Sequence, residues 1–292
     1  MKTVVCVWLA LAPLVAVGQD YLDQFPLRQQ TKYFDFRFKR NPESIKEIAR
    51  FADGFIEVVN RDFFKADFEY PIRVLVLEDR ASFQNCLRQE FGITDPPRFG
   101  IFLYRFNLFA TYEDSGLGTF AHEIMHPLVE RNLKDRPIWA IEGIPTFFEK
   151  FYGCWQGEDL ILHWGYQNPW RIDALGTNLA RLDLKSILST TVSPGSYSES
   201  DRRLVAVFLW EQGKFKRFLN LIKTRQKDGY DSYFEAALEM PVECAVPLWQ
   251  NYLERIENQR NEIFRLPVST VLPNKEAFKG FVESFMQPPP GG

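Results

Sequence analysis

The first half of the chain carries two kinds of hydrophobic pattern. Aromatic and polar residues alternate over residues 33–38, and residues 72–77 are mostly branched and apolar, so both segments are predicted to be strands. Between them, residues 42–63 place apolar side chains three and four positions apart, which is typical of an amphipathic helix. Three further elements are predicted before residue 115, namely a short helix over 82–91 and strands over 99–104 and 108–112.

After residue 115 helical periodicity predominates, with one strand-like apolar run at residues 160–164. Helices are predicted over residues 136–152, 198–212, 214–227, 231–239 and 247–263. This order indicates an α+β fold, with a strand-rich N-terminal subdomain packed on a mostly helical C-terminal subdomain. We expect these subdomains to cover residues 19–135 and 136–265, with a ligand cleft between them. Residues 266–292 end in a proline-rich tail and are predicted to be a partly disordered extension.

Residues 1–18 have the three parts of a secretory signal peptide. Lys2 gives a positive start, residues 3–15 are apolar, and the segment ends in the small residue Gly18. The apolar run is short for a membrane span of about 20 residues. The mature chain is therefore predicted to begin at Gln19, to be secreted or periplasmic, and not to insert stably into a membrane.

Charge and cysteine content narrow the possible partners. Removal of Lys2 with the signal peptide changes the formal net charge from −3 to −4. This mild acidity gives no reason to expect nucleic acid or an anionic membrane as a partner. The mature chain keeps Cys86, Cys154 and Cys244, which allows one disulfide or none after export.

The most informative motif is the segment His122-Glu123-Ile124-Met125-His126. Four residues advance a helix by about one turn, so both imidazoles leave the same helix face with Cβ atoms about 5–6 Å apart. That separation lets two ring nitrogens approach one ion at about 2.0–2.1 Å each. Glu123 lies about 100° around the helix, beside the ion. This H-E-x-x-H pattern is typical of zinc metallopeptidases, and two core histidines beside an incidental glutamate are the alternative.

A catalytic zinc ion needs a third protein ligand and one position open to water. Val129 and Asn132 stand where a metzincin has glycine and histidine, so that arrangement is excluded. Glu142 is the better candidate, because a helical hairpin can return it from the next predicted helix to the histidines. Glu149, two turns later, is either an acceptor for a ligand imidazole or a solvated glutamate. Glu130 is expected to be a surface charge.

With these residues in view, the sequence resembles the gluzincins, in particular the small peptidase MA-like domains. These domains combine an H-E-x-x-H helix with a P-x-W-x-x-E-G helix, and the second motif appears here at residues 137–143. The resemblance covers roughly residues 30–265. Two prolines depart from the family pattern: Pro127 directly follows the second histidine, and Pro145 replaces the small residue usual after Glu-Gly.

Carried over by position, the resemblance implies His122, His126 and Glu142 as ligands of one zinc ion per chain, held in the cleft between the subdomains. It implies Glu123 as the general base in hydrolysis of a peptide bond by zinc-activated water. A donor to the oxyanion is also expected in this family, and Tyr197, just before a predicted helix, is similar in position to a recurrent family tyrosine.

Three other features have two interpretations each. Tyr166 is the rival of Tyr197 as oxyanion donor, and either tyrosine can instead be a packing residue. His163 lies in an apolar run and is expected to be a core or edge histidine rather than a ligand. Residues 108–112 are either an ordinary sheet strand or an edge strand to which an extended peptide adds.

The predicted function is an exported zinc metallopeptidase that acts on a peptide or protein substrate. One alternative is a catalytically inactive relative that binds a peptide, protein or glycan, and another is a zinc hydrolase acting on a different bond. The intact Glu123 favours the enzyme, since a binding module has no need of a general base.

Overall fold

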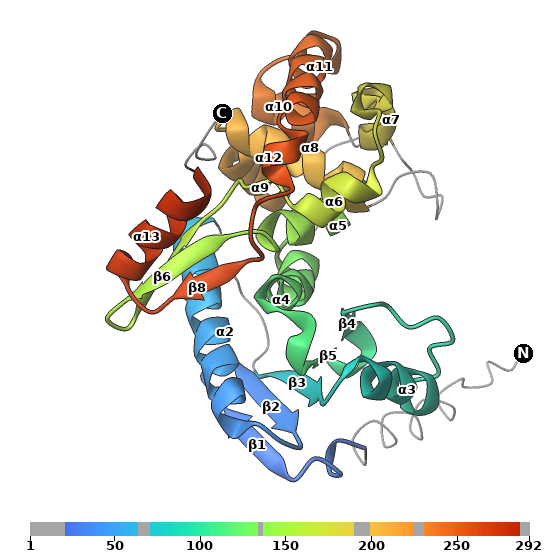
Figure 1. Cartoon of the computed structure of the whole chain (residues 1–292). Coiled ribbons are helices and arrows are strands. Elements are labelled where there is room, and N and C mark those ends of the chain that lie inside the picture. Colours follow the sequence, from blue (N-terminus) through green and yellow to red (C-terminus); the bar gives the residue numbers. More distant parts are fainter. Residues whose placement is uncertain (1–20, 64–70, 134–136, 190–198, 225–230, 287–292) are drawn as a thin grey trace, which may run out of the picture. The chain divides into compact units, whose positions relative to one another are not determined.

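The structure is a computed structural model that describes residues 21–63, 71–133, 137–189, 199–224 and 231–286. It has a mixed α+β fold with two sheets, and the α+β class expected from the sequence is confirmed (Figure 1). Contacts between Cα atoms divide the chain into two units. One contains Met1–Asp53 and Glu69–Glu123, and the other contains Gly54–Phe68 and Ile124–Gly292. The predicted signal peptide and the proline-rich end of the chain lie outside the described residues.

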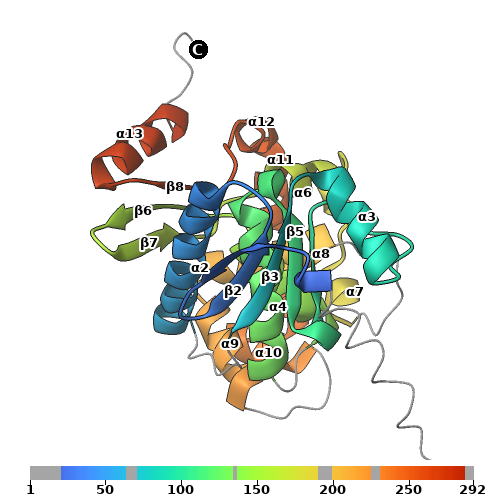
Figure 2. The ribbon, with the colours of Figure 1, turned by 90° about the horizontal axis from the view of Figure 1, so that it is seen from below.

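The first unit contains a five-stranded sheet with the strand order β1-β2-β3-β5-β4 (Figure 1). Figure 2 shows its strands β2, β3 and β5. Its strands are β1 (Leu27–Gln30), β2 (Phe34–Phe38), β3 (Ile72–Leu77), β4 (Gly100–Leu103) and β5 (Leu108–Tyr112). β2, β3 and β5 are parallel, and antiparallel β1 and β4 form the two edges. All four strands predicted in this region are confirmed, whereas β1 was not predicted. The suggestion that residues 108–112 form an edge strand is wrong, because β5 is paired on both sides and β4 is the edge.

Side-chain alternation gives this sheet two covered faces. Strand register places Phe36, Val74 and Phe109 side by side on one face. Phe120 of α4 (Leu117–Asn132) packs there, with its ring centroid 5.9 Å from Phe36 and 4.9 Å from Phe109, and Phe51 of α2 (Pro42–Asp62) adds to the cluster. The opposite face packs with α3 (Arg80–Glu90) in a cluster that includes Leu75, Leu77, Phe83, Leu87, Leu108 and Ala110. Two short 3-10 helices, η1 (Tyr104–Phe106) and η2 (Glu113–Ser115), flank β5. The sheet therefore anchors the first turns of α4 through Phe120.

The second unit consists mainly of helices. They are α5 (Ile138–Phe148), α6 (Pro169–Ala174), η3 (Leu179–Arg181), α7 (Leu184–Ser189), α8 (Glu199–Glu211), α9 (Phe215–Thr224), α10 (Asp231–Leu238), α11 (Val242–Asn258) and α12 (Arg260–Ile263). The four helices predicted after residue 197 are confirmed as α8, α9, α10 and the pair α11–α12, whereas α6 and α7 were not predicted. Aromatic side chains form much of the core around the end of α5, namely Phe63, Phe147, Phe148, Trp164, Trp210 and Phe215.

A three-stranded sheet in the order β7-β6-β8 also belongs to the second unit. Its strands are β6 (Tyr152–Gln156), β7 (Asp159–His163) and β8 (Thr270–Leu272), and α13 (Lys275–Met286) follows them. The helix predicted over residues 136–152 is wrong at its end, because α5 stops at Phe148 and Tyr152 begins β6. Pairing with β7 and with the distant β8 overrides the helical spacing of the aromatic residues here. The predicted strand at residues 160–164 is confirmed as β7. In the extension predicted over residues 266–292, β8 and α13 are regular elements, and residues 287–292 lie outside the described residues.

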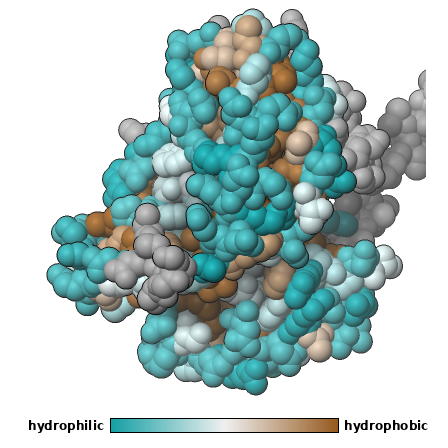
Figure 3. All heavy atoms as spheres, turned by 45° about the horizontal axis from the view of Figure 1, so that its top comes forward, coloured by the Kyte–Doolittle hydropathy of each residue, from teal (hydrophilic) through white to brown (hydrophobic). Residues whose placement is uncertain are grey.

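Hydrophilic side chains cover most of the face shown in Figure 3, and hydrophobic residues form small groups among them. Within the described residues, no helix combines the length and the apolar character needed to cross a bilayer. Cys86, Cys154 and Cys244 are free thiols.

Candidate metal centre

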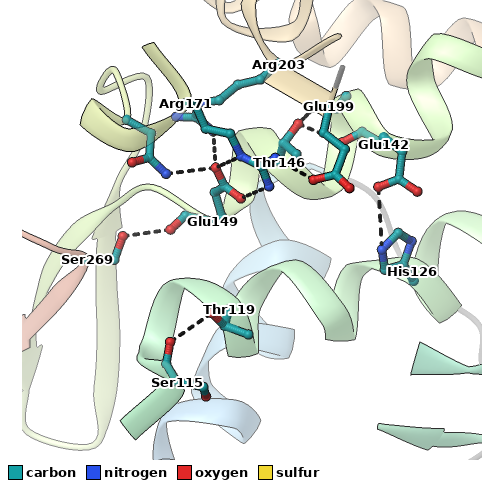
Figure 4. Close-up of polar contacts among 12 residues, drawn as sticks. Ser115, Thr119, His126, Glu142, Thr146, Glu149, Arg171, Glu199, Arg203 and Ser269 are labelled. Atoms are coloured by element: carbon teal, nitrogen blue, oxygen red, sulfur yellow. Dashed lines mark hydrogen bonds and ion pairs between the residues drawn. The ribbon is translucent and has the colours of Figure 1, made fainter. Parts of the chain in front are cut away.

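Helix α4 carries the side chains of the H-E-x-x-H motif. His122, Glu123 and His126 are 7, 7 and 9% exposed. The first turn of the helix is fixed by a hydrogen bond from the Thr119 hydroxyl to the Ser115 carbonyl oxygen (2.8 Å, Figure 4). Burial of three titratable side chains on one helix is costly unless they bind one another or a ligand. This segment is therefore a candidate functional site.

Pro127 lies inside α4 without ending it. A proline has no N–H to donate, so the carbonyl group of Glu123 loses its usual helical donor. The helix nevertheless continues to Asn132, whose side chain donates to the Leu128 carbonyl oxygen (2.9 Å). The departure from the family pattern therefore leaves both histidines on one continuous helix.

Glu142 lies on α5, which packs closely against α8. A Cβ atom at Gly143 would lie 2.9 Å from the carbonyl oxygen of Arg202, so only glycine allows this approach of the two helices. Pro145 again removes a helical N–H one turn further on. The Thr146 hydroxyl spans this turn by donating to the carbonyl oxygens of Glu142 (2.7 Å) and Gly143 (3.1 Å).

The structure brings the three predicted ligands together. One ligand atom each of His122, His126 and Glu142 lie within 4.8 Å of one another, and His126 Nε2 is 3.7 Å from Glu142 Oε2 (Figure 4). Ligand atoms of a tetrahedral zinc ion lie about 3.3 Å apart at bond lengths of about 2.0–2.1 Å. Small side-chain movements would therefore fit all three to one ion, and two imidazoles with one carboxylate are a known donor set of catalytic zinc. Glu130, on the same helix, is exposed as expected.

Glu123 is outside this ligand group and lies against the edge strand β4. A Cβ atom at Gly100 would lie 3.1 Å from Cγ of Glu123 and 2.9 Å from Cγ2 of Thr119. The backbone of β4 is thus in direct contact with the part of α4 that carries Glu123. Nothing in the local sequence around Gly100 indicates this contact, because it arises from the packing of the strand on the helix.

Glu149 does not have either of the roles expected from the sequence. It is 5% exposed, so it is not solvated, and its carboxylate lies away from His126 (Figure 4). Asn168 Nδ2 donates to Oε1 (2.8 Å), and Arg171 donates through Nε to Oε1 (2.9 Å) and through Nη2 to Oε2 (2.8 Å). Arg203 Nη1 is 4.0 Å from Oε1. Burial lowers the pKa of Arg203 to about 10 against the attraction of Glu149, so Arg203 keeps its charge at neutral pH.

Two other residues singled out in the sequence take part in packing. The Tyr166 ring contacts the Tyr152 ring at a centroid distance of 4.5 Å, and burial raises the pKa of Tyr166. His163 lies on the edge strand β7 and stacks on Phe278 at 4.9 Å, as expected for an edge histidine, and burial lowers its pKa. Tyr197 lies outside the described residues.

No protein-family model and no curated protein matches this sequence. The function therefore has to be inferred from the residues and their geometry.

Proposed function

We propose that this chain is an exported zinc metallopeptidase of the gluzincin type that hydrolyses peptide bonds in peptide or protein substrates. The main support is the grouping of His122, His126 and Glu142, with Glu123 on the same helix as both histidines. Three protein ligands of this kind leave a fourth tetrahedral position for solvent. The same four residues carry the resemblance to gluzincins, and the export signal is inferred from residues 1–18.

A zinc ion in this position would polarise the scissile carbonyl group and lower the pKa of the attacking water toward about 7. Glu123 would accept the proton of that water and deliver it to the leaving amine. The location of Glu123 beside the ligand group, rather than within it, supports this role. Tyr197 remains the proposed donor to the oxyanion, from the resemblance alone.

The edge position of β4 supports an extended peptide as substrate. An edge strand presents unpaired N–H and C=O groups, to which a peptide backbone adds as a further strand. β4 also contacts the part of α4 that carries Glu123, through Gly100. A peptide bound along β4 would therefore bring its backbone close to the proposed general base.

The test uses the mature protein, starting at Gln19, with a denatured protein mixture in the presence and absence of a zinc chelator. Cleavage sites are identified by mass spectrometry, and the zinc content is measured. We expect chelator-sensitive cleavage, and we expect Glu123→Gln to keep its zinc but to lose about 10²–10⁴-fold in kcat/KM. Glu130→Gln, exposed on the same helix, is the matched control and should behave like the parent. Cleavage by Glu123→Gln at the parental rate would exclude Glu123 as the base.

The alternative is an inactive gluzincin-like module that binds a peptide, protein or glycan. One observation favours it: both helices that carry proposed ligands contain a proline close to a ligand, Pro127 next to His126 and Pro145 three residues after Glu142. One zinc ion per chain without cleavage of any substrate, together with saturable peptide or glycan binding, would support this module.

A further inference from the structure

A group of buried charges joins the end of α5 to two other helices of the second unit. Glu149 follows the last residue of α5, Arg171 belongs to α6 and Arg203 to α8. Their exposed fractions are 5, 6 and 1%. Charges this deeply buried are tolerated only when they are paired with good geometry. The pairing therefore fixes how these three helices meet.

Arg171 makes the central contacts of this group. Its Nε and Nη2 atoms donate to the two carboxylate oxygens of Glu149, and its Nη1 atom donates to Glu199 in the first turn of α8 (Figure 4). The fork-to-fork contact with Glu149 is directional, because two parallel hydrogen bonds define both the position and the plane of the carboxylate. The side chain of Glu199 is 47% exposed, so it is the solvent-facing end of this chain of contacts.

The C-terminal end of α5 is linked to Glu142 through the hydrogen bonds and the packing of this helix. α5 has only 11 residues and contains Pro145, so its placement depends on its neighbours more than on its own hydrogen bonds. Thr146 links the turn after Pro145 back to the carbonyl oxygens of Glu142 and Gly143. Gly143 rests on the backbone of α8. α5 is thus held against α8 at two points, beside Glu142 and, two turns later, through Glu149.

We propose that Arg171 is a positioning residue for the metal site. Arg171 binds both Glu149 and Glu199, and so it holds α5 against α8. In this position and orientation of α5, the Glu142 carboxylate lies near His122 and His126 as the third ligand. This inference rests on the proposed function, since it takes Glu142 as a metal ligand. In this role Arg171 contacts neither metal nor substrate.

The test measures the dissociation constant for Zn²⁺ by competition with a chromophoric chelator, and the melting temperature of the metal-free protein. Arg171→Lys keeps the charge but loses the planar fork, so the contact with Glu149 loosens. We expect zinc binding to weaken about tenfold, the lower end of the effect reported for residues that orient metal ligands. Glu199→Gln removes one charged partner at a half-exposed position, where folding is not at risk, and should weaken zinc binding by a smaller factor.

Ile256→Val is the control for a purely structural effect. Ile256 is buried on α11, and its shortening should lower the melting temperature while leaving zinc affinity at the parental value. Parental affinity in both Arg171→Lys and Glu199→Gln would overturn the proposal. The proposal would also be overturned if Ile256→Val lost as much zinc affinity as Arg171→Lys when both variants lose the same amount of melting temperature. If the parent protein binds zinc but cleaves no peptide, the proposed function is contradicted, and the zinc affinities of the variants still test the role of Arg171. If the parent protein binds no zinc, the proposed function and the role of Arg171 are both contradicted.

Discussion

At Gly100 the backbone of β4 approaches α4 so closely that any Cβ atom would lie 2.9 Å from Thr119 and 3.1 Å from Glu123. Contacts this short require either the strand or the contacted side chains, Glu123 among them, to move. A general base works only within hydrogen-bond reach of the proton that it removes. A misplacement of about 1 Å in a catalytic geometry can cost about 10²-fold in rate. The absence of a side chain at this position therefore matters for Glu123.

We expect Gly100→Ala to lower kcat/KM at least about tenfold while the protein keeps one zinc ion per chain. The ligands His122, His126 and Glu142 are untouched, so the loss should come from the base and from the bound peptide. Steady-state kinetics with a cleaved peptide, together with metal analysis, checks this. Gly280→Ala is the control, because its Cβ atom would meet nothing within 4 Å. Full activity of Gly100→Ala would mean that β4 yields without disturbing Glu123.

Among the elements, the junction between α5, β6 and the segment before β8 contains a buried amine. Lys150 is 2% exposed and donates a hydrogen bond to the Pro267 carbonyl oxygen. Two residues further on, the Ser269 hydroxyl donates to the Glu149 carbonyl oxygen (2.7 Å, Figure 4). Burial lowers the pKa of Lys150 to about 7, and the nearby charge of Arg203 acts in the same direction. The folded chain therefore favours the neutral amine above about pH 7.

This pKa predicts how stability depends on pH. The unfolded chain keeps the Lys150 proton up to about pH 10.5, whereas the folded chain releases it near pH 7. Between these values the unfolded state binds more protons, so Lys150 makes the free energy of unfolding rise with pH across this window. Lys150→Met should remove that rise and be more stable than the parent at pH 7. Urea denaturation between pH 7 and pH 10 measures the free energy of unfolding of both proteins. Lys214→Met is the control, because Lys214 forms an ion pair with Glu239 at the surface. Equal slopes in the parent and Lys150→Met would contradict the assignment.

Helices and strands could be predicted from the sequence where the pattern of their own residues determines the secondary structure. β3 and β5 were predicted with their exact ends because each is a short apolar run buried on both faces. β1 has the polar sequence Leu-Arg-Gln-Gln and exists through its pairing with β2. β6 and β8 depend on each other across a long stretch of chain, which no local pattern reveals.

In the candidate metal site too, local sequence predicts some residues, and others depend on distant parts of the chain. The spacing of His122 and His126 determines their common helix face, so the histidine pair could be predicted from the motif alone. Glu142 was chosen because a helical hairpin can return it to the histidines, and the second motif of the family resemblance points to the same residue. Helical periodicity placed Glu149 on a face of the helix predicted over residues 136–152. It could not identify the partner of Glu149, because Arg171 comes from a helix that was not predicted.

For the molecule as a whole, metal binding and folding should be coupled. The proposed ligands come from α4 and α5, and the unfolded chain does not hold these segments together. A ligand that binds only the folded state stabilises it by an amount set by its concentration relative to its dissociation constant, about 2.7 kcal/mol at a hundredfold excess. Stabilisation by a cation bound elsewhere on the surface would not depend on His122, His126 and Glu142.

We expect a hundredfold excess of Zn²⁺ over its dissociation constant to raise the melting temperature of the mature protein by about 5 °C, from the usual relation between stability and melting temperature for a chain of this length. A chelator should reverse the shift. Glu142→Gln should remove most of it, because a neutral amide is a poor zinc ligand and leaves only two imidazoles. Scanning calorimetry of the parent, Glu142→Gln and the surface control Glu130→Gln distinguishes specific binding from a general salt effect. A shift of equal size in all three proteins would place the zinc somewhere other than the group formed by His122, His126 and Glu142.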